Sequence, residues 1–176
     1  MSGRDGGMTR GARTKRLTVC ALLAALAMIL SYIDSAIPYN MGAPGVKLGL
    51  ANLVILIALY EIGLKDAALI NLVRILVVGL TFSGLMATAY SLAGGFLSLT
   101  VMALLKKTDL FSMVGVSMAG GVAHNLGQLL IAALVVENMK MFLYFPILVY
   151  TGIAAGIGMG IIAYLTSRKL PKTLWV

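Results

Sequence analysis

The amino-acid sequence predicts an all-α fold, a polytopic membrane protein built as a bundle of six transmembrane helices. Of its 176 residues, 60% are hydrophobic and 11% are charged, whereas soluble domains average about 45–50% and about 25%. The charged residues cluster between long apolar runs. Each run is close to the roughly 20 residues that a helix needs to cross a bilayer, so no separate soluble domain is expected.

The first predicted span covers residues 16–34. It follows residues 1–15, which are polar, glycine-rich and basic and are predicted to form a disordered cytoplasmic tail. A basic segment before an apolar run also resembles a signal peptide. The run is long for a signal sequence and no clean Ala-x-Ala site follows it, which favours a retained helix.

Breaks of charged or turn-forming residues separate the remaining spans. These spans cover residues 47–63, 66–82, 84–105, 111–136 and 141–166. The predicted transmembrane domain is therefore 16–168, and residues 169–176 form a cytoplasmic tail. The break from Asp34 to Val46 is the longest and carries two prolines and two glycines. A plain connector is the commoner role for such a loop, and a lid over a site is the alternative.

Most basic residues fall on one side of this bundle. Six spans place both termini on the same side, together with eleven basic residues: Arg4, Arg10, Arg13, Lys15, Arg16, Lys65, Lys106, Lys107, Arg168, Lys169 and Lys172. Lys47 and Lys140 fall on the other side, and Arg74 falls within the third span. The positive-inside rule then predicts cytoplasmic termini in the cell membrane, with lipids around the bundle. It also explains the net charge of +8 without a nucleic-acid partner.

Several kinds of chemistry are unsupported by the sequence. The chain has one cysteine, Cys20, and one histidine, His124, so neither an intramolecular disulfide nor a usual zinc site is expected. A phosphate-binding G-x-x-x-x-G-K-[ST] loop and aspartate-rich clusters for magnesium diphosphate are both missing from the sequence. All six acidic residues lie in the tail or at span ends: Asp5, Asp34, Glu61, Asp66, Asp109 and Glu137. We therefore predict no catalytic residue, no metal and no cofactor.

Arg74 is the one charged residue within a predicted span. A charge near the bilayer centre costs at least about 2.5–3.5 kcal/mol, so Arg74 must face the bundle interior, a partner or water. A ligand contact is one interpretation, and a hydrogen bond between helices is the other. Asn71 lies one turn away and is expected on the same face.

Polar residues gather in the predicted outer half of the bundle. His124 and Gln128 lie one turn apart in the fifth span, and Asn125 lies about 100° around the helix from His124. Other spans bring further polar residues to a similar depth: Asn52, Tyr90, Ser91, Tyr150 and Thr151. Individually, such residues often bond neighbouring helices or anchor at the membrane interface. Their shared depth below the long loop favours a pocket open to the outside.

Small residues predict close helix packing in three places. In the sixth and fifth spans they form two rows: Gly152, Gly156 and Gly160, and Ala119, Ala123 and Gly127. We expect these rows to pack helices within the chain. Ala21 and Ala25 form a similar patch near the cytoplasmic end of the first span, where a partner could bind.

Four stretches resemble a known family: KLGLANLVILIALY (47–60), NLVRILVVGLTFSG (71–84), YSLAGGFLSLTVMALLK (90–106) and GVSMAGGVAHNLGQLLIAALV (115–135). They are similar to the Gx transporter family, a group often labelled heptaprenyl diphosphate synthase component I. The whole pattern also resembles substrate-binding S components of energy-coupling factor (ECF) vitamin transporters. That resemblance implies ligand capture outside, and association with a transmembrane T component and two ATPase subunits. It maps the T-component contact onto Ala21 and Ala25.

The predicted function is substrate binding for uptake of a small organic molecule. Lys47 and Arg74 are cationic and no acidic residue lies inside a span, which favours an anionic ligand. A vitamin-like ring or an isoprenoid- or quinone-related precursor fits that description. Two alternatives remain: a membrane partner of a flavin or quinone electron-transfer system, and a non-catalytic subunit of isoprenoid diphosphate synthesis.

Overall fold

The computed structural model describes residues 10–36 and 49–175, and every regular element in these ranges is helical. The predicted all-α fold is therefore confirmed. The elements in chain order are α1 (Arg10–Ala36), α2 (Leu50–Glu61), α3 (Leu64–Val78), the π-helical turn η1 (Gly79–Ser83), α4 (Leu85–Thr108), α5 (Met113–Val136), the 3₁₀ turn η2 (Met139–Tyr144), α6 (Phe145–Lys169) and the 3₁₀ turn η3 (Lys172–Leu174). The helix α1 already begins at Arg10, within the predicted tail, whereas Lys47 and most of the predicted long loop lie outside the described residues.

Five helical stretches in the described part of the chain are long and apolar enough to cross a membrane. Their outward faces carry large apolar side chains, such as Leu22 and Phe96 with exposed fractions of 65% and 75%. Such faces suit contact with lipid, and the protein is a multi-pass membrane protein.

The helix α2 differs from the other five. Its 12 residues give a length of about 18 Å, shorter than the roughly 30 Å hydrocarbon core. Most of its side chains are buried, including Val54, Ile55 and Leu56 at 1% exposure. At its carboxyl end, the Lys106 ammonium of α4 donates hydrogen bonds to the carbonyl oxygens of Leu59 (2.6 Å) and Tyr60 (3.4 Å). A cation there satisfies carbonyls that have no partner within the helix.

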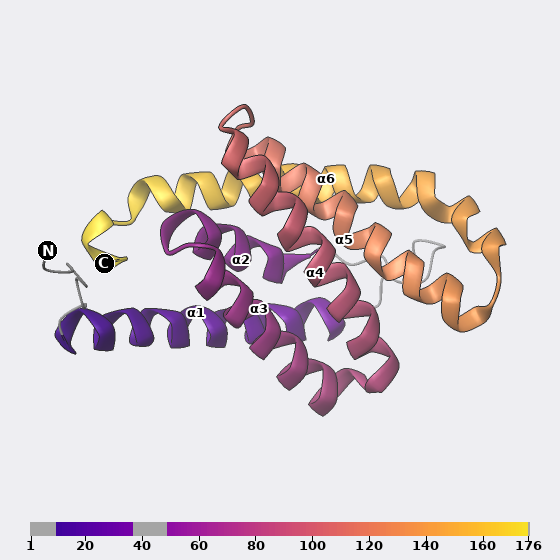
Figure 1. Cartoon of the computed structure of the whole chain (residues 1–176), viewed down its shortest axis with the longest axis horizontal. Coiled ribbons are helices and arrows are strands. Elements are labelled where there is room, and N and C mark those ends of the chain that lie inside the picture. The colour runs from indigo at the N-terminus through magenta and orange to yellow at the C-terminus, as the bar shows by residue number, and fades with distance from the viewer. Residues whose placement is uncertain (1–9, 37–48, 176) are drawn as a thin grey trace, which may run out of the picture.

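The helices form two packed groups (Figure 1). The first contains α1, α2 and α3, and the second contains α4, α5 and α6 packed in chain order. Contacts of α2 with α6 and of α3 with α4 join the groups. In Figure 1, α1 and α6 run roughly horizontally with α1 below α6, while α4 crosses obliquely from below the level of α1 to above that of α6.

Glycines set the closest helix contacts. A Cβ atom added at Gly156 of α6 would lie 2.5 Å from the Cα of Met118 in α5, and Gly152 and Gly160 meet α5 backbone in the same way. On the other side of α5, a Cβ at Gly127 would lie 2.7 Å from the carbonyl oxygen of Ala93 in α4. The prediction that these small residues pack helices within the chain is confirmed.

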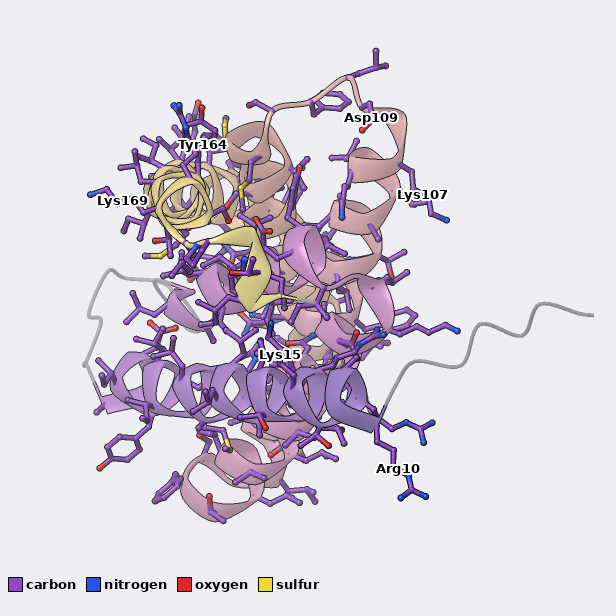
Figure 2. The ribbon with its side chains drawn as sticks, turned by 90° about the vertical axis from the view of Figure 1, so that its left-hand side faces the viewer. Arg10, Lys15, Lys107, Asp109, Tyr164 and Lys169 are labelled. Atoms are coloured by element: carbon purple, nitrogen blue, oxygen red, sulfur yellow. The ribbon has the colours of Figure 1, made fainter. Side chains whose placement is uncertain are left out.

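Basic residues gather at one end of the bundle, which we call the basic end (Figure 2). Among them are Arg10, Lys15, Lys107 and Lys169. Arg16 of α1 forms an ion pair with Asp66 at the start of α3, and Lys15 donates a hydrogen bond to the carbonyl oxygen of Thr173. Trp175 is also buried, in the same hydrophobic cluster as residues of α2. The two ends of the described chain therefore pack together at this end.

Candidate functional site

The structure divides the predicted pocket residues between two cavities, both at the end of the bundle opposite the basic end. Arg74, Asn52, Ser91 and His124 line the first, which we call the polar cavity. Tyr90, Asn125 and Gln128 line the second, which lies among α4, α5, η2 and α6 and which we call the α4–α6 cavity. Lys47, also predicted to line the pocket, lies outside the described residues.

Arg74 anchors the polar cavity through bonds to other helices. Its guanidinium donates to the Oδ1 of Asn71 from Nε (3.0 Å) and from one terminal nitrogen (2.8 Å). The other terminal nitrogen donates to the hydroxyl of Ser31 in α1 (3.2 Å). Asn71 in turn donates to the carbonyl oxygen of Gly95 in α4 (3.2 Å). Arg74 is thus only 7% exposed and connects α1, α3 and α4, as the interhelical interpretation requires.

Asp34 also lies in the polar cavity. It is 6% exposed, accepts a hydrogen bond from the backbone N–H of Gly49 (3.1 Å), and attracts the positive charge of Arg74. The polar cavity therefore includes an acidic side chain, a residue that was placed at a span end from the sequence and was not assigned to the pocket. Asp34 stands at a span end in the sequence, but the last turn of α1 carries it inward beside Ser31, one turn earlier.

The polar cavity is small. Its volume is about 40 Å³, room for a few water molecules at about 10–15 Å³ each. A ring-shaped ligand does not fit there. A third space, of about 20 Å³, is lined by Asn52, His124 and Asn125 and has room for about one water molecule.

The α4–α6 cavity is about tenfold larger, at about 420 Å³, within the range of small-molecule sites. Its wall is mostly apolar, and no charged side chain among the described residues lines it. The full lining set is Ala87, Tyr90, Asn125, Gln128, Leu129, Ala132, Val136, Met141, Tyr144 and Leu148. Tyr90 and Gln128 are half-buried, and neither makes a hydrogen bond to another residue of the described chain. Their polar groups are available to a ligand.

Asn125 has a different role from Gln128. Its amide nitrogen donates to the carbonyl oxygen of Leu148 in α6 (2.8 Å) and lies 3.4 Å from the hydroxyl of Thr151. It is 7% exposed, so it joins α5 to α6 within the wall. Tyr150, predicted at the same depth, is 75% exposed on the outside of α6 and suits a membrane-interface anchor.

A close contact between α4 and α5 separates the two cavities. A Cβ at Gly94 of α4 would lie 2.8 Å from the carbonyl oxygen of His124 and 3.0 Å from the Cγ of Gln128. His124 and Gln128, one turn apart on α5, flank this contact and reach different cavities. Residue depth alone could not indicate this division.

Sequence reasoning missed Ser31 and Asp34 in the polar cavity and Met141 and Tyr144 in the α4–α6 cavity. A signal existed for the first pair, because polar residues three apart share a helix face. The second pair lies on η2, whose 3₁₀ turns the apolar pattern does not distinguish from α6.

The family model for heptaprenyl diphosphate synthase component I matches residues 23–166. The chain belongs to this family. The matched region includes both cavities and all of α2 to α5, so the family resemblance predicted from the sequence is confirmed. Searches of curated proteins and of solved structures gave no match.

Proposed function

We propose that this member of the family is the substrate-binding subunit of an uptake system, and is not itself an enzyme. The α4–α6 cavity is the observation that supports this most. It combines a volume of about 420 Å³ with two polar side chains, Tyr90 and Gln128, that have no hydrogen-bond partner among the described residues. Such a wall, mostly apolar with a few polar groups, is typical of small-molecule sites.

The direction of binding follows from the charge distribution. The cavity lies at the end opposite the basic end, and basic segments remain in the cytoplasm under the positive-inside rule. In the cell membrane, with both termini cytoplasmic, the cavity would then face the outside. A ligand captured there needs a second component for its release inward, because the sequence carries no phosphate-binding loop of its own.

The energising partner we propose is of the ECF type, a T component with two ATPase subunits. Its contact would include Ala21 and Ala25 of α1. Ala21 is exposed and Ala25 half-exposed, and neighbouring Leu22 is 65% exposed. Small side chains on an open apolar face support close approach of another helix.

Co-purification with a small molecule tests the proposal. The chain, purified in mild detergent from a host grown on rich medium, should retain a bound small molecule in native mass spectrometry. Ala132→Phe, which fills the α4–α6 cavity, should lose that molecule while keeping its helical content. Absence of any bound molecule from several hosts, or equal retention by Ala132→Phe, would count against a substrate-binding subunit.

A second candidate rests on the family's own description. The family is described as heptaprenyl diphosphate synthase component I. This description favours a non-catalytic subunit of isoprenoid diphosphate synthesis. Affinity purification from the native host separates the two candidates. Recovery of ATPase subunits supports uptake, whereas recovery of a prenyl-transferring subunit, with synthase activity lost on deleting this chain, supports synthesis.

A further inference from the structure

We infer that the ligand of the α4–α6 cavity is an uncharged, largely apolar molecule with a ring-sized body and a hydrogen-bonding group that meets Gln128. This inference rests on the proposed function, since it assumes that the cavity holds a small molecule. It replaces the anionic ligand expected from the sequence. Three features of the structure carry it.

The first feature is the absence of charged side chains from the cavity wall, as far as the described residues 10–36 and 49–175 form it. All ten residues that line the cavity are uncharged. Glu137 at the end of α5 and Lys140 within η2 are exposed, opposite in charge and outside the lining. An anion transferred into such a wall would lose its hydration with no cation in return, which is strongly unfavourable in a membrane protein.

The second feature is that Arg74 does not supply the missing cation. It lines the polar cavity, on the other side of the α4–α5 contact. Its guanidinium is hydrogen-bonded to Asn71 and Ser31, and Asp34 balances its charge. The part of the anionic expectation that rested on Arg74 therefore does not apply to the larger cavity, while Lys47, the other cation of that expectation, lies outside the described residues.

The third feature is the pair of polar groups that remains. The amide of Gln128 both donates and accepts hydrogen bonds, and so does the hydroxyl of Tyr90. Neither group has a protein partner among the described residues, although both are half-buried at membrane depth. A carbonyl or hydroxyl on the ligand would satisfy them, whereas a lipid acyl chain would leave them unbonded. The tyrosines at 90 and 144 also offer aromatic surface to a ring.

A matched set of probes tests the ligand class. 2-Acetylnaphthalene is uncharged with one carbonyl, 2-naphthoate has the same ring and is anionic at pH 7.5, and 2-ethylnaphthalene has no polar group. Binding of each radiolabelled probe is measured on the full chain in phosphatidylcholine nanodiscs. Subtracting the signal of Ala132→Phe nanodiscs removes partition into lipid, and Ala87→Phe provides a second blocked cavity should the first variant fold poorly.

We expect cavity-specific binding of 2-acetylnaphthalene and on the order of 100-fold weaker binding of 2-naphthoate, as the penalty for an intramembrane charge requires. Gln128→Leu should weaken the binding of 2-acetylnaphthalene by up to about tenfold and leave the binding of 2-ethylnaphthalene unchanged. Lys140→Gln, an exposed control outside the lining, should change the binding of neither 2-acetylnaphthalene nor 2-naphthoate. Tighter binding of 2-naphthoate, or an effect of Lys140→Gln on it, would overturn the uncharged class.

The remaining outcomes separate this inference from the proposed function. If a small molecule co-purifies and proves to be an anion, the ligand class is wrong while substrate binding stands. The same conclusion follows if a small molecule co-purifies but no probe binds above the blocked variants. A phospholipid that is retained by the wild-type chain and lost from Ala132→Phe also overturns the class. Failure of both co-purification and probe binding overturns the proposed function itself.

Discussion

The two cavities lie at the same end of the bundle and differ in how their polar groups are satisfied. In the polar cavity, Arg74, Asn71 and Asp34 bond to groups on other elements. In the α4–α6 cavity, Tyr90 and Gln128 have no such bond among the described residues. The comparison indicates that a polar side chain at membrane depth points to a ligand only where its neighbours leave it without a partner.

Replacing Arg74 should produce the largest effect on stability. Arg74→Ala leaves Asp34 buried without its opposite charge and is expected to lower the free energy of unfolding by about 3–5 kcal/mol. Denaturant unfolding followed by circular dichroism in detergent measures the change. Arg74→Lys keeps the charge and loses the forked bond to Asn71, so its loss should be smaller. If Arg74→Ala kept the stability of the wild type but no longer bound the ligand, the polar cavity would instead be the binding site.

The wall between the cavities offers the next test. Gly127→Ala places a Cβ 2.7 Å from the carbonyl oxygen of Ala93 and should lower the unfolding free energy by about 1–3 kcal/mol through overpacking. Gly158→Ala is the matched control, because a Cβ there meets nothing within 4 Å. Thermal unfolding of both variants side by side checks the difference. Equal melting temperatures would mean that the α4–α5 contact is looser than described.

Asn125 should show a moderate structural effect. Asn125→Ala removes the bond to the carbonyl oxygen of Leu148, and interhelical hydrogen bonds of this kind average about 0.6 kcal/mol, with about 1.7 kcal/mol at most. The same denaturant titration measures the loss. The relative binding of the three naphthalene probes should remain that of the wild type. A change in their relative binding would assign Asn125 a direct ligand contact.

Gln128 should show the smallest effect on stability. Gln128→Leu breaks no hydrogen bond within the described chain, so the unfolding free energy should stay within about 0.5 kcal/mol of the wild type. Unfolding is measured without ligand, so that only the effect of the substitution on the protein itself is compared. A loss as large as that of Asn125→Ala would show that Gln128 bonds to the protein, and the contrast between the cavities would disappear.

Much of the fold could be predicted from the sequence because it depends on local patterns. The lengths of the hydrophobic runs predicted all six α-helices, and the glycine row at 152, 156 and 160 predicted the close packing of α6 on α5. The length of α2 was overestimated at both ends: the predicted span 47–63 includes Gly49, which precedes the helix with φ +69°, and Ile62 and Gly63, which follow its last residue Glu61. Periodicity does not distinguish a buried helix from a full span.

The site was predicted less well, because depth along a helix says little about direction around it. Tyr90 and Ser91 are neighbours in sequence and line different cavities, as do His124 and Gln128. Their separation depends on how closely α4 approaches α5, which is a property of two helices together. Asp34 was missed for a related reason: it is buried where the end of α1 meets Gly49 at the start of α2, a contact between residues that are far apart in the sequence pattern.

The buried helix α2 has a consequence for how this sequence tolerates change. On the lipid face of α1, one large apolar residue can replace another with little effect, because lipid adapts to its shape. Around Val54, Ile55 and Leu56, rigid protein surrounds every side chain, and a change of one methylene is felt as in a soluble protein. Saturation mutagenesis should therefore find the least tolerant segment of this membrane protein in the helix with the least contact with the membrane.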